Sequence, residues 1–430
     1  MDSNTIYRVI IDQREELTAY ADPALVSREE AQLIEINSPL AQVVIGVRRS
    51  GKSTLCHMAL QAAGVDYAYV NFDDDRLADL RTEDLNLILE NIYRVYGPDV
   101  KYLFFDEIQN VDGWYLFVNR LLRLKFHVFV TGSNARLLSS ELASHLTGRS
   151  HEIRLYPFSF KDFCSVKGLD CNLPTTRNVA LLKNALDEYL MEGGFPELMH
   201  LGSKQEYISN LLDTIITKDI MRRYRLRNAN GLKTLANHLL NNAAQLINMT
   251  ELTETLGIGS DKTVRNYLDY LGQAFLIVPL QKFSYKSAER LRQGKAFAVD
   301  SGLLTYRRDV LSSANMGWRL ENAVLLELRR RNHSKDKDIF YYKPSTNSRE
   351  VDFAVTERGQ LQELIQVSYD VSSPKTLKRE IDALKDAACR TGCRNLTLVA
   401  CTDSRKVEDD GLEINIVSAV DWLLGNRLGV

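Results

Sequence analysis

The sequence predicts an α/β fold with a parallel β-sheet in its N-terminal part, and three observations favour this fold. First, short apolar segments alternate with helical patterns up to about residue 155, which is typical of a three-layer α/β domain. Second, the first apolar segment runs through a glycine turn into a helical segment. Third, a later apolar segment ends in two carboxylates. The expected strands are 40–46, 67–72, 101–106, 126–131 and 151–155.

Composition limits the class of protein. The chain has 430 residues, enough for two to four domains, and its 45% hydrophobic and 26% charged content is ordinary for a globular protein. The net charge of −2 means that any nucleic-acid surface is local. A polar N-terminus and the absence of any apolar run near 20 residues predict no signal peptide and no membrane span. Six cysteines without a C-x-x-C pair favour reduced thiols and a cytoplasmic location.

The first motif is VVIGVRRSGKSTL, residues 43–55, in which Gly46, Gly51, Lys52 and Ser53 fit the phosphate-binding pattern G-x-x-x-x-G-K-[ST]. The glycines let backbone N–H groups face anionic oxygens, and the following helix adds its positive N-terminal end. Lys52 is expected to reach the β- and γ-phosphates of ATP, and Ser53 to ligate Mg²⁺. The motif lies between a predicted strand and a predicted helix, and this position argues against a chance match to the pattern. The expected nucleotide-contacting residues are Gly46, Arg49, Ser50, Gly51, Lys52, Ser53 and Thr54.

Two further strands end in polar residues that suit hydrolysis. In YLFFDEIQ, residues 102–109, Asp106 is expected to hold Mg²⁺ through its water shell, and Glu107 to orient and polarise the attacking water. In VFVTGSNA, residues 128–135, Asn134 or Ser133 is expected to contact the γ-phosphate or that water. Each segment alone also fits an ordinary strand end or turn. Together with the glycine loop, they predict a nucleotide-hydrolysing site.

In this order the motifs resemble the AAA+ ATPases, and more narrowly a prokaryotic group with a C-terminal domain related to restriction-endonuclease folds. The resemblance implies a P-loop core with ATPase activity, a helical lid, a winged-helix module and a nuclease-like α/β domain. The expected boundaries are 1–156, 157–245, 246–308 and 309–430. The matching segments are GVRRSGKST, YVNFDDDRL, LFFDEIQNV, VTGSNARLL, LTGRSHEIRLYPFSFKDF, YLMEGGFPEL, KDI and GWRLENAVLLELRRR.

The same resemblance implies self-association into a ring or partial ring, with a hexamer as the expected form and nucleotide held between neighbours. An arginine of one subunit would then complete the site of the next and cancel charge on the γ-phosphate. Arg149 in LTGRS is the candidate for this role and Arg136 the alternative, while a surface salt bridge also fits Arg149. Arg48 and Arg49 are expected either beside the phosphates or facing a neighbouring subunit.

Residues 248–299 contain two short helical patterns, at about 250–256 and 261–274, joined by a glycine-containing turn. This is a helix-turn-helix outline, and strand patterns flank a basic tip after it, as in a wing. A second basic run is KDIMRRYRLR, residues 218–227. Winged helices also serve as protein-contact modules, so both DNA and a protein partner remain open. The expected DNA contacts are Lys262 and Arg265 on the second helix, and Lys286, Arg290, Arg292 and Lys295 at the tip.

The C-terminal part resembles a PD-(D/E)xK nuclease in which the chemistry is damaged. Glu321 lies in a helical pattern and Asp352 in a strand pattern, as the resemblance requires. Gln366 and Ser368 stand where such nucleases carry the acid and the lysine, so nuclease activity is not expected. The favoured function is an ATPase that remodels or moves along duplex or branched DNA. The alternatives are a nucleotide-gated protein-interaction switch and an active ATP-dependent nuclease.

Overall fold

The chain forms two compact units, Met1–Leu155 with Gln273–Phe275, and Tyr156–Gly272 with Leu276–Val430. The four-part division at 1–156, 157–245, 246–308 and 309–430 remains a prediction. This computed structural model describes residues 1–17, 25–133, 146, 148–226, 230–258, 260–284, 286, 294–308, 310, 315–332, 336–345 and 348–425. In these ranges, every helix is too short or too polar to span a lipid bilayer.

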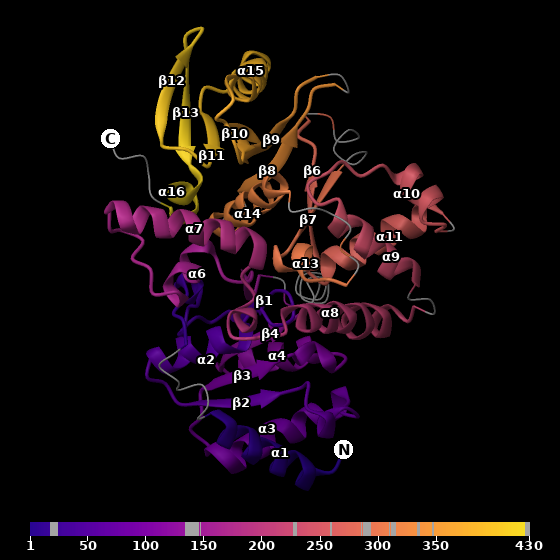
Figure 1. Cartoon of the computed structure of the whole chain (residues 1–430). Coiled ribbons are helices and arrows are strands. Elements are labelled where there is room, and N and C mark those ends of the chain that lie inside the picture. The colour runs from indigo at the N-terminus through magenta and orange to yellow at the C-terminus, as the bar shows by residue number, and fades with distance from the viewer. Residues whose placement is uncertain are drawn as a thin grey trace. The chain divides into compact units, whose positions relative to one another are not determined.

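The first unit contains a five-stranded, fully parallel sheet, which confirms the predicted α/β class (Figure 1). Its strand order is β2-β3-β4-β1-β5, so the first strand in sequence lies inside the sheet. Each strand differs from its predicted range by no more than one residue at either end. The strands are β1 (Ala41–Ile45), β2 (Tyr67–Asn71), β3 (Tyr102–Asp106), β4 (His127–Gly132) and β5 (Ser150–Arg154).

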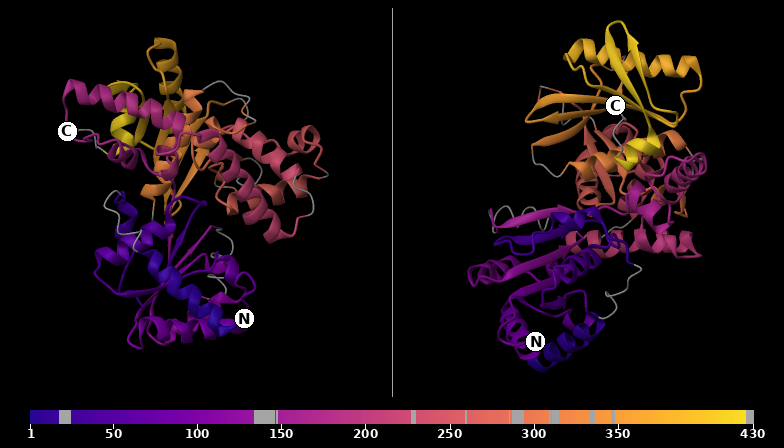
Figure 2. Two further views of the ribbon diagram at one scale, coloured as in Figure 1. Left: turned by 60° about the horizontal axis from the view of Figure 1, so that its bottom comes forward. Right: turned by 90° about the vertical axis from the view of Figure 1, so that its left-hand side faces the viewer.

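Helices pack on both faces of this sheet because successive strand residues point to opposite sides. Phe104 of β3 belongs to a core cluster with Leu55 and Leu60 of α2. The next residue, Phe105, packs its ring against Phe117 of α4 at a centroid distance of 5.7 Å. The unit is drawn in indigo and purple in Figure 2. Its helices are α1 (Ser3–Glu16), α2 (Lys52–Ala62), α3 (Leu85–Tyr96) and α4 (Trp114–Arg123).

The second unit begins with helices and a small hairpin. The two predicted helices of the helix-turn-helix outline are present, and two antiparallel strands follow them. The winged-helix assignment itself remains a prediction. The helices are α6 (Phe160–Val166), α7 (Thr176–Glu192), α8 (Lys204–Thr214), α9 (Asn230–Asn241), α10 (Met249–Thr255), α11 (Asp261–Gln273) and α13 (Gly302–Thr305); α8 continues as a π-helix over Ile215–Arg222. The strands are β6 (Ile277–Gln281) and β7 (Gly294–Ala298).

A six-stranded mixed sheet of order β12-β13-β11-β10-β9-β8 completes the second unit. The helix α15 covers one face, where Ile381 and Leu384 share a core cluster with Leu364 and Leu398. The endonuclease-like assignment of this part remains a prediction. Its elements are α14 (Met316–Arg331), β8 (Lys337–Tyr342), β9 (Val351–Glu357), β10 (Gln360–Ser368), α15 (Pro374–Thr391), β11 (Leu396–Ala400), β12 (Arg405–Asp409), β13 (Leu412–Ser418) and α16 (Ala419–Leu424).

A buried polar junction accounts for the glycine pair in MEGGFPEL. The Asp300 carboxylate accepts the N–H of Gly194 at 2.6 Å and that of Gly302 at 2.8 Å. The Gly194 carbonyl accepts the Phe158 N–H at 2.7 Å. Burial raises the pKa of Asp300 to about 7, although both N–H donors and the Arg330 charge oppose that rise. Three segments far apart in sequence therefore meet at one carboxylate and two glycines.

We expect Gly194→Ala to destabilise the second unit, because the added Cβ would lie 2.2 Å from the Phe158 carbonyl oxygen. Backbone cannot move aside as a flexible side chain can, so the expected loss is about 1–3 kcal/mol of unfolding free energy. The measurement is denaturant unfolding followed by tryptophan fluorescence. Gly202→Ala is the matched control, because a Cβ there meets nothing within 4 Å. Equal stability of the two variants would contradict the junction.

Candidate active site

The loop between β1 and α2 has the tight backbone path that the phosphate-binding pattern predicts. A Cβ on Gly46 would lie 2.1 Å from the Leu155 carbonyl oxygen, so no larger residue fits there. Gly51 has a φ of +92°, a left-handed conformation that glycine adopts without strain. Arg49 has a φ of +65° and is exposed, which is unusual for a residue with a side chain.

Lys52 lies inside this loop rather than in solvent. Its side chain is 5% exposed, its Nζ donates to the Val47 carbonyl at 3.1 Å, and Nζ lies 3.6 Å from Glu107 Oε1. The Ser50 hydroxyl is fully buried and has no hydrogen-bond partner within the described part of the chain. A buried hydroxyl of this kind is a site that a ligand oxygen would satisfy. Thr54 is half-buried on α2.

Asp106 is held at the end of β3 by three hydroxyl groups. Tyr69 donates to its carboxylate at 3.1 Å, and Thr131 and Ser53 donate as well. Burial raises the pKa of Asp106, the negative charge of Glu107 adds to that rise, and the hydroxyls of Thr131 and Ser53 oppose it. Ser53 and Asp106 are thus in contact, as expected for the two predicted Mg²⁺ residues. A hydroxyl and a carboxylate are oxygen ligands that suit this cation.

Glu107 is oriented by two side chains, one from the 3₁₀ turn Ile108–Asn110 and one from the residue that directly follows β4. Its φ of 51° turns the chain sharply, and its Oε2 accepts the Gln109 amide and the Ser133 hydroxyl, the latter at 3.2 Å. Burial opposes ionisation, but the charges of Lys52 and Arg48 outweigh it, so the pKa of Glu107 is lowered. A carboxylate with a lowered pKa is ionised at neutral pH, as a group that polarises water must be. Gln109 was missed by the sequence analysis.

Arg149 lies at the opposite edge of the sheet from this loop. Its carbonyl accepts the Ala41 N–H at 2.9 Å, and Ala41 pairs with Ser150 where β1 begins. The phosphate-binding loop follows Ile45, where β1 ends. Arg149 is exposed, and the length of β1 separates it from the phosphate-binding loop of its own chain. Asn134 and Arg136 lie outside the described residues.

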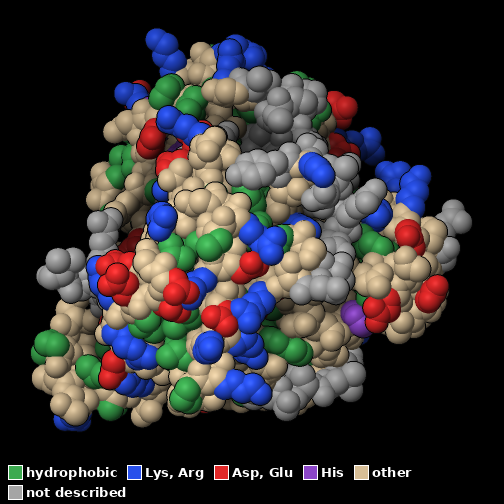
Figure 3. Space-filling view, turned by 90° about the horizontal axis from the view of Figure 1, so that it is seen from above, with side chains coloured by type: hydrophobic (Ala, Val, Ile, Leu, Met, Phe, Trp, Pro, Cys, Tyr) green, Lys and Arg blue, Asp and Glu red, His purple; other side chains and the backbone are tan. Residues whose placement is uncertain are grey.

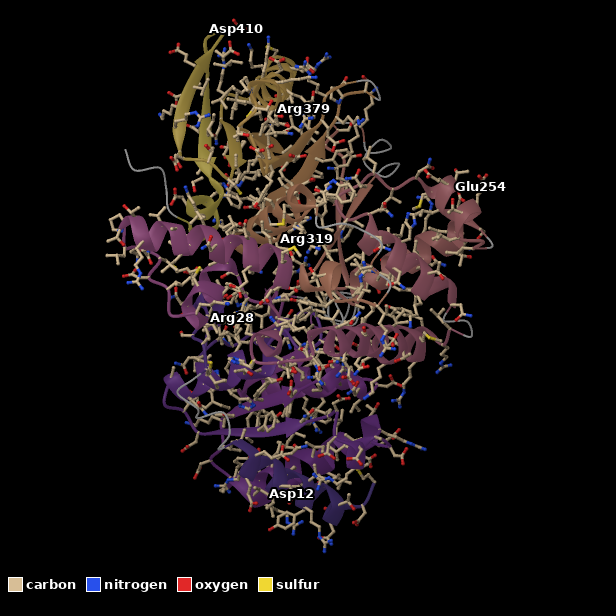
Figure 4. The ribbon with its side chains drawn as sticks, viewed as in Figure 1. Asp12, Arg28, Glu254, Arg319, Arg379 and Asp410 are labelled. Atoms are coloured by element: carbon tan, nitrogen blue, oxygen red, sulfur yellow. The ribbon has the colours of Figure 1, made fainter. Side chains whose placement is uncertain are left out.

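A buried ion pair supports the loop from outside, and the sequence analysis did not identify it. Arg28 donates to the Ser50 carbonyl at 3.1 Å and to Glu30 Oε1 at 3.0 Å (Figure 4). Both side chains are less than one-tenth exposed. Glu30 lies in the short 3₁₀ turn Glu29–Leu33, which precedes β1. The charged tetrapeptide SREE is a weak signal for this role, because such segments usually lie on the surface.

The predicted DNA contacts fall into three groups. Lys262 and Arg265 are exposed on α11, and Lys286 is exposed as well. Arg290 and Arg292 lie outside the described residues. Lys295 does not lie on an exposed tip, and its assignment as a DNA contact was wrong. It lies in β7, its side chain is 4% exposed, and it pairs with two carboxylates of the second unit.

Those carboxylates belong to a pocket of about 420 Å³ in the second unit. Lys295 Nζ lies 2.9 Å from Glu321 and 2.7 Å from Glu350. Burial raises the pKa of Asp352 well above its usual value, and the charge of Glu321 adds to the rise. Gln366 donates to Glu380 at 2.8 Å. The Lys295 ammonium therefore lies beside two carboxylates that line the pocket. Lys295 is on β7, whereas Ser368, at the position expected for the nuclease lysine, is on β10.

Comparison with known proteins now adds to this geometry. A family model described as an AAA domain matches residues 38–164, and a domain of unknown function (DUF8612) matches residues 183–314. Uncharacterized protein MJ1544 of Methanocaldococcus jannaschii is 35% identical over 382 residues, covering 86% of this chain and 83% of that protein. An uncharacterized protein of Haemophilus influenzae is 32% identical over 424 residues, covering 93% and 99%. The chain belongs to this family of AAA-domain proteins.

Two solved structures are similar at a much greater distance. AMPPCP-bound DnaA from Aquifex aeolicus is 15% identical with a TM-score of 0.25, covering 58% of this chain and 89% of that one. RuvB from Thermotoga maritima, a Holliday junction branch migration motor, is 15% identical with a TM-score of 0.30, covering 59% and 89%. A likeness this distant supports no statement about the present AAA-domain protein. The predicted AAA resemblance is confirmed by the family model.

We expect the double variant Arg28→Met/Glu30→Met to weaken ATP binding about tenfold, because the Ser50 carbonyl loses a charged hydrogen-bond donor. Both charges are removed together because a single change would leave a buried charge unpaired and destabilise the fold. The measurement is isothermal titration with ATP. Arg76→Met is the control, because Arg76 pairs with Asp12 and Asp74 and its side chain is 39% exposed. If the double variant folds and binds ATP with wild-type affinity, the Arg28–Glu30 pair does not support the phosphate-binding loop.

Proposed function

We propose that this AAA-domain protein binds ATP with Mg²⁺ and hydrolyses it. The observation that carries this proposal is the distance of 3.6 Å between Lys52 Nζ, at the end of the glycine loop, and Glu107 Oε1, directly after β3. The residue expected to bind phosphate therefore lies next to the residue expected to activate water. Ser53 and Asp106, in contact beside them, would hold Mg²⁺, which shields phosphate charge when bound.

Each residue of the site has a separate task in hydrolysis. Lys52 exchanges its contacts with Val47 and Glu107 for the phosphate oxygens, and this exchange releases Glu107. The Glu107 carboxylate then accepts a hydrogen bond from the attacking water and polarises it. Ser133 and Gln109 keep that carboxylate in place. The backbone N–H groups between Gly46 and Ser53 favour the anionic phosphates.

Two substitutions test this assignment. Lys52→Ala is expected to abolish ATP binding or hydrolysis, because the phosphate loses its counter-cation. Glu107→Gln is expected to bind ATP and stop turnover, because an amide cannot polarise water as a carboxylate does. The measurements are titration with ATP and release of phosphate. Glu90→Gln, an exposed residue on α3, is the control. Hydrolysis at the wild-type rate by Glu107→Gln would show that another group activates the water.

The proposed active form is a ring, expected as a hexamer, in which Arg149 completes the site of a neighbour. Its exposed position at the far edge of the sheet from its own loop supports action in trans. Arg149→Ala is expected to bind ATP almost normally and to hydrolyse it on the order of 10³-fold more slowly.

Mixing Arg149→Ala protein with Glu107→Gln protein is expected to restore part of the activity, because the two defects then fall on different interfaces. Arg154→Ala is the control, since Arg154 is exposed on β5, the strand that begins directly after Arg149, and pairs with Glu152. Absence of rescue, with a protein that stays monomeric in ATP, would exclude the ring.

We further propose that this protein uses ATP binding and hydrolysis to act on DNA in the cytoplasm. The exposed Lys262, Arg265 and Lys286 support this part. The face in Figure 3 intersperses Lys and Arg with Asp and Glu, so a nucleotide-gated switch that docks a protein partner is the alternative. A gel-shift panel of single-stranded, duplex and branched DNA, with and without a non-hydrolysable ATP analogue, separates the two. No DNA cleavage is expected, because Gln366 and Ser368 replace the acid and the lysine.

A further inference from the structure

Two sequence features that ATP hydrolysis does not use meet in the second unit. The basic run at 218–227 and the helix α11 are joined by a pair of tyrosine rings. Tyr224 stacks on Tyr270 with a centroid distance of 3.8 Å and an interplanar angle of 15°. Tyr267 lies 6.5 Å from Tyr270. All three tyrosines are half-buried.

The basic run follows an unusual backbone path. The π-helix Ile215–Arg222 contains residues 218–222 of the run, and Arg225 has a φ of +51°. π-helical turns are rare and occur often at functional sites, and a non-glycine residue with positive φ stores strain. Arg222 and Arg225, which lie on either side of Tyr224 in the sequence, are both exposed.

One cation and one amide on α11 lie in line with the tyrosine pair. On α11, Lys262, Asn266 and Tyr270 are spaced four residues apart and therefore share one helix face. Lys262 and Asn266 are exposed, and this face leads from them to the tyrosine pair. Acidic residues also occur in this region. Asp261 accepts the Thr253 hydroxyl at 2.7 Å, and Glu254 is exposed on α10 (Figure 4).

We propose that this surface, made of Tyr224, Tyr270, Lys262, Arg222 and Arg225, binds single-stranded nucleic acid. The proposal rests on the DNA-binding part of the proposed function and names its substrate class. A base that is free to leave its stack lies flat on a tyrosine ring, and the flanking cations neutralise the phosphates on either side. Bases in a duplex are stacked on each other and cannot reach the rings. A protein partner would not produce a salt dependence that scales with phosphate contacts.

The test uses the full chain, a labelled oligothymidylate and the duplex of that oligonucleotide with oligoadenylate. Tyr270→Leu is expected to weaken single-strand binding roughly 5- to 150-fold and to leave duplex binding within about twofold. Lys262→Gln is expected to lower the log–log salt slope for the single strand by about 0.7. An oligonucleotide with 2-aminopurine is expected to be quenched by wild type and not by Tyr270→Leu.

Two controls separate stacking and charge from loss of fold. Tyr93→Leu removes a 37% exposed tyrosine on α3, and Arg123→Gln removes an exposed arginine on α4; neither is expected to change binding. Single-strand affinity unchanged in Tyr270→Leu would overturn the inference, and so would a preference for duplex. If the inference fails in either way but the protein still binds duplex DNA, the proposed action on DNA stands. Binding of neither form by an active ATPase would reject the DNA proposal and this inference together.

Discussion

The first unit depends on the compensation of two adjacent carboxylates buried where β3 ends. The Thr131 hydroxyl contacts both residues: it donates to the Asp106 carboxylate and accepts the Glu107 N–H at 3.0 Å. Thr131 lies on β4, the strand between β3 and β1, so the sheet order places it there. Lys52 supplies the positive charge from the loop after β1. Because unpaired buried charges are costly, the sheet order, the loop and the carboxylates are mutually dependent.

The parts of this arrangement that local sequence determines were predictable. Apolar runs defined the five strands, and a glycine pattern defined the loop, because both signals lie within a few consecutive residues. Gln109 was not found although its partner Glu107 is only two residues away, because the sequence does not show the sharp turn of the chain at Glu107. Arg28 was not found because only the folded chain brings the Ser50 carbonyl near it. Lys295 was misjudged for the same reason. It was counted with the basic tip, but it lies in the strand β7 among buried residues, and its partners Glu321 and Glu350 are distant in sequence.

In the second unit, the buried groups that need partners are backbone N–H and C=O groups instead of charged side chains. Arg330 donates to the Pro157 carbonyl at 2.8 Å, and Tyr189 donates to the Phe158 carbonyl at 3.0 Å. Asp300 receives two backbone N–H groups in the same region. A buried loop carries backbone polar groups that must be satisfied, and here side chains from helices and turns satisfy them. The role of the glycines in MEGGFPEL could not be predicted from the sequence, because it depends on contacts with Phe158 and Asp300, which are distant in the chain.

One of the covalent links between the two units, Leu155–Tyr156, starts beside the phosphate-binding loop. Leu155 donates its N–H to the Ile45 carbonyl at 2.7 Å, and its own carbonyl lies against Gly46. The second unit begins at the next residue, and within it Pro157 and Phe158 are held by Arg330. Since Gly46 leaves no free space toward Leu155, the loop cannot shift at that point without moving Leu155. If the proposed ATP binding shifts the loop at Gly46, Leu155 must move with it, and Leu155 is the residue that precedes the second unit.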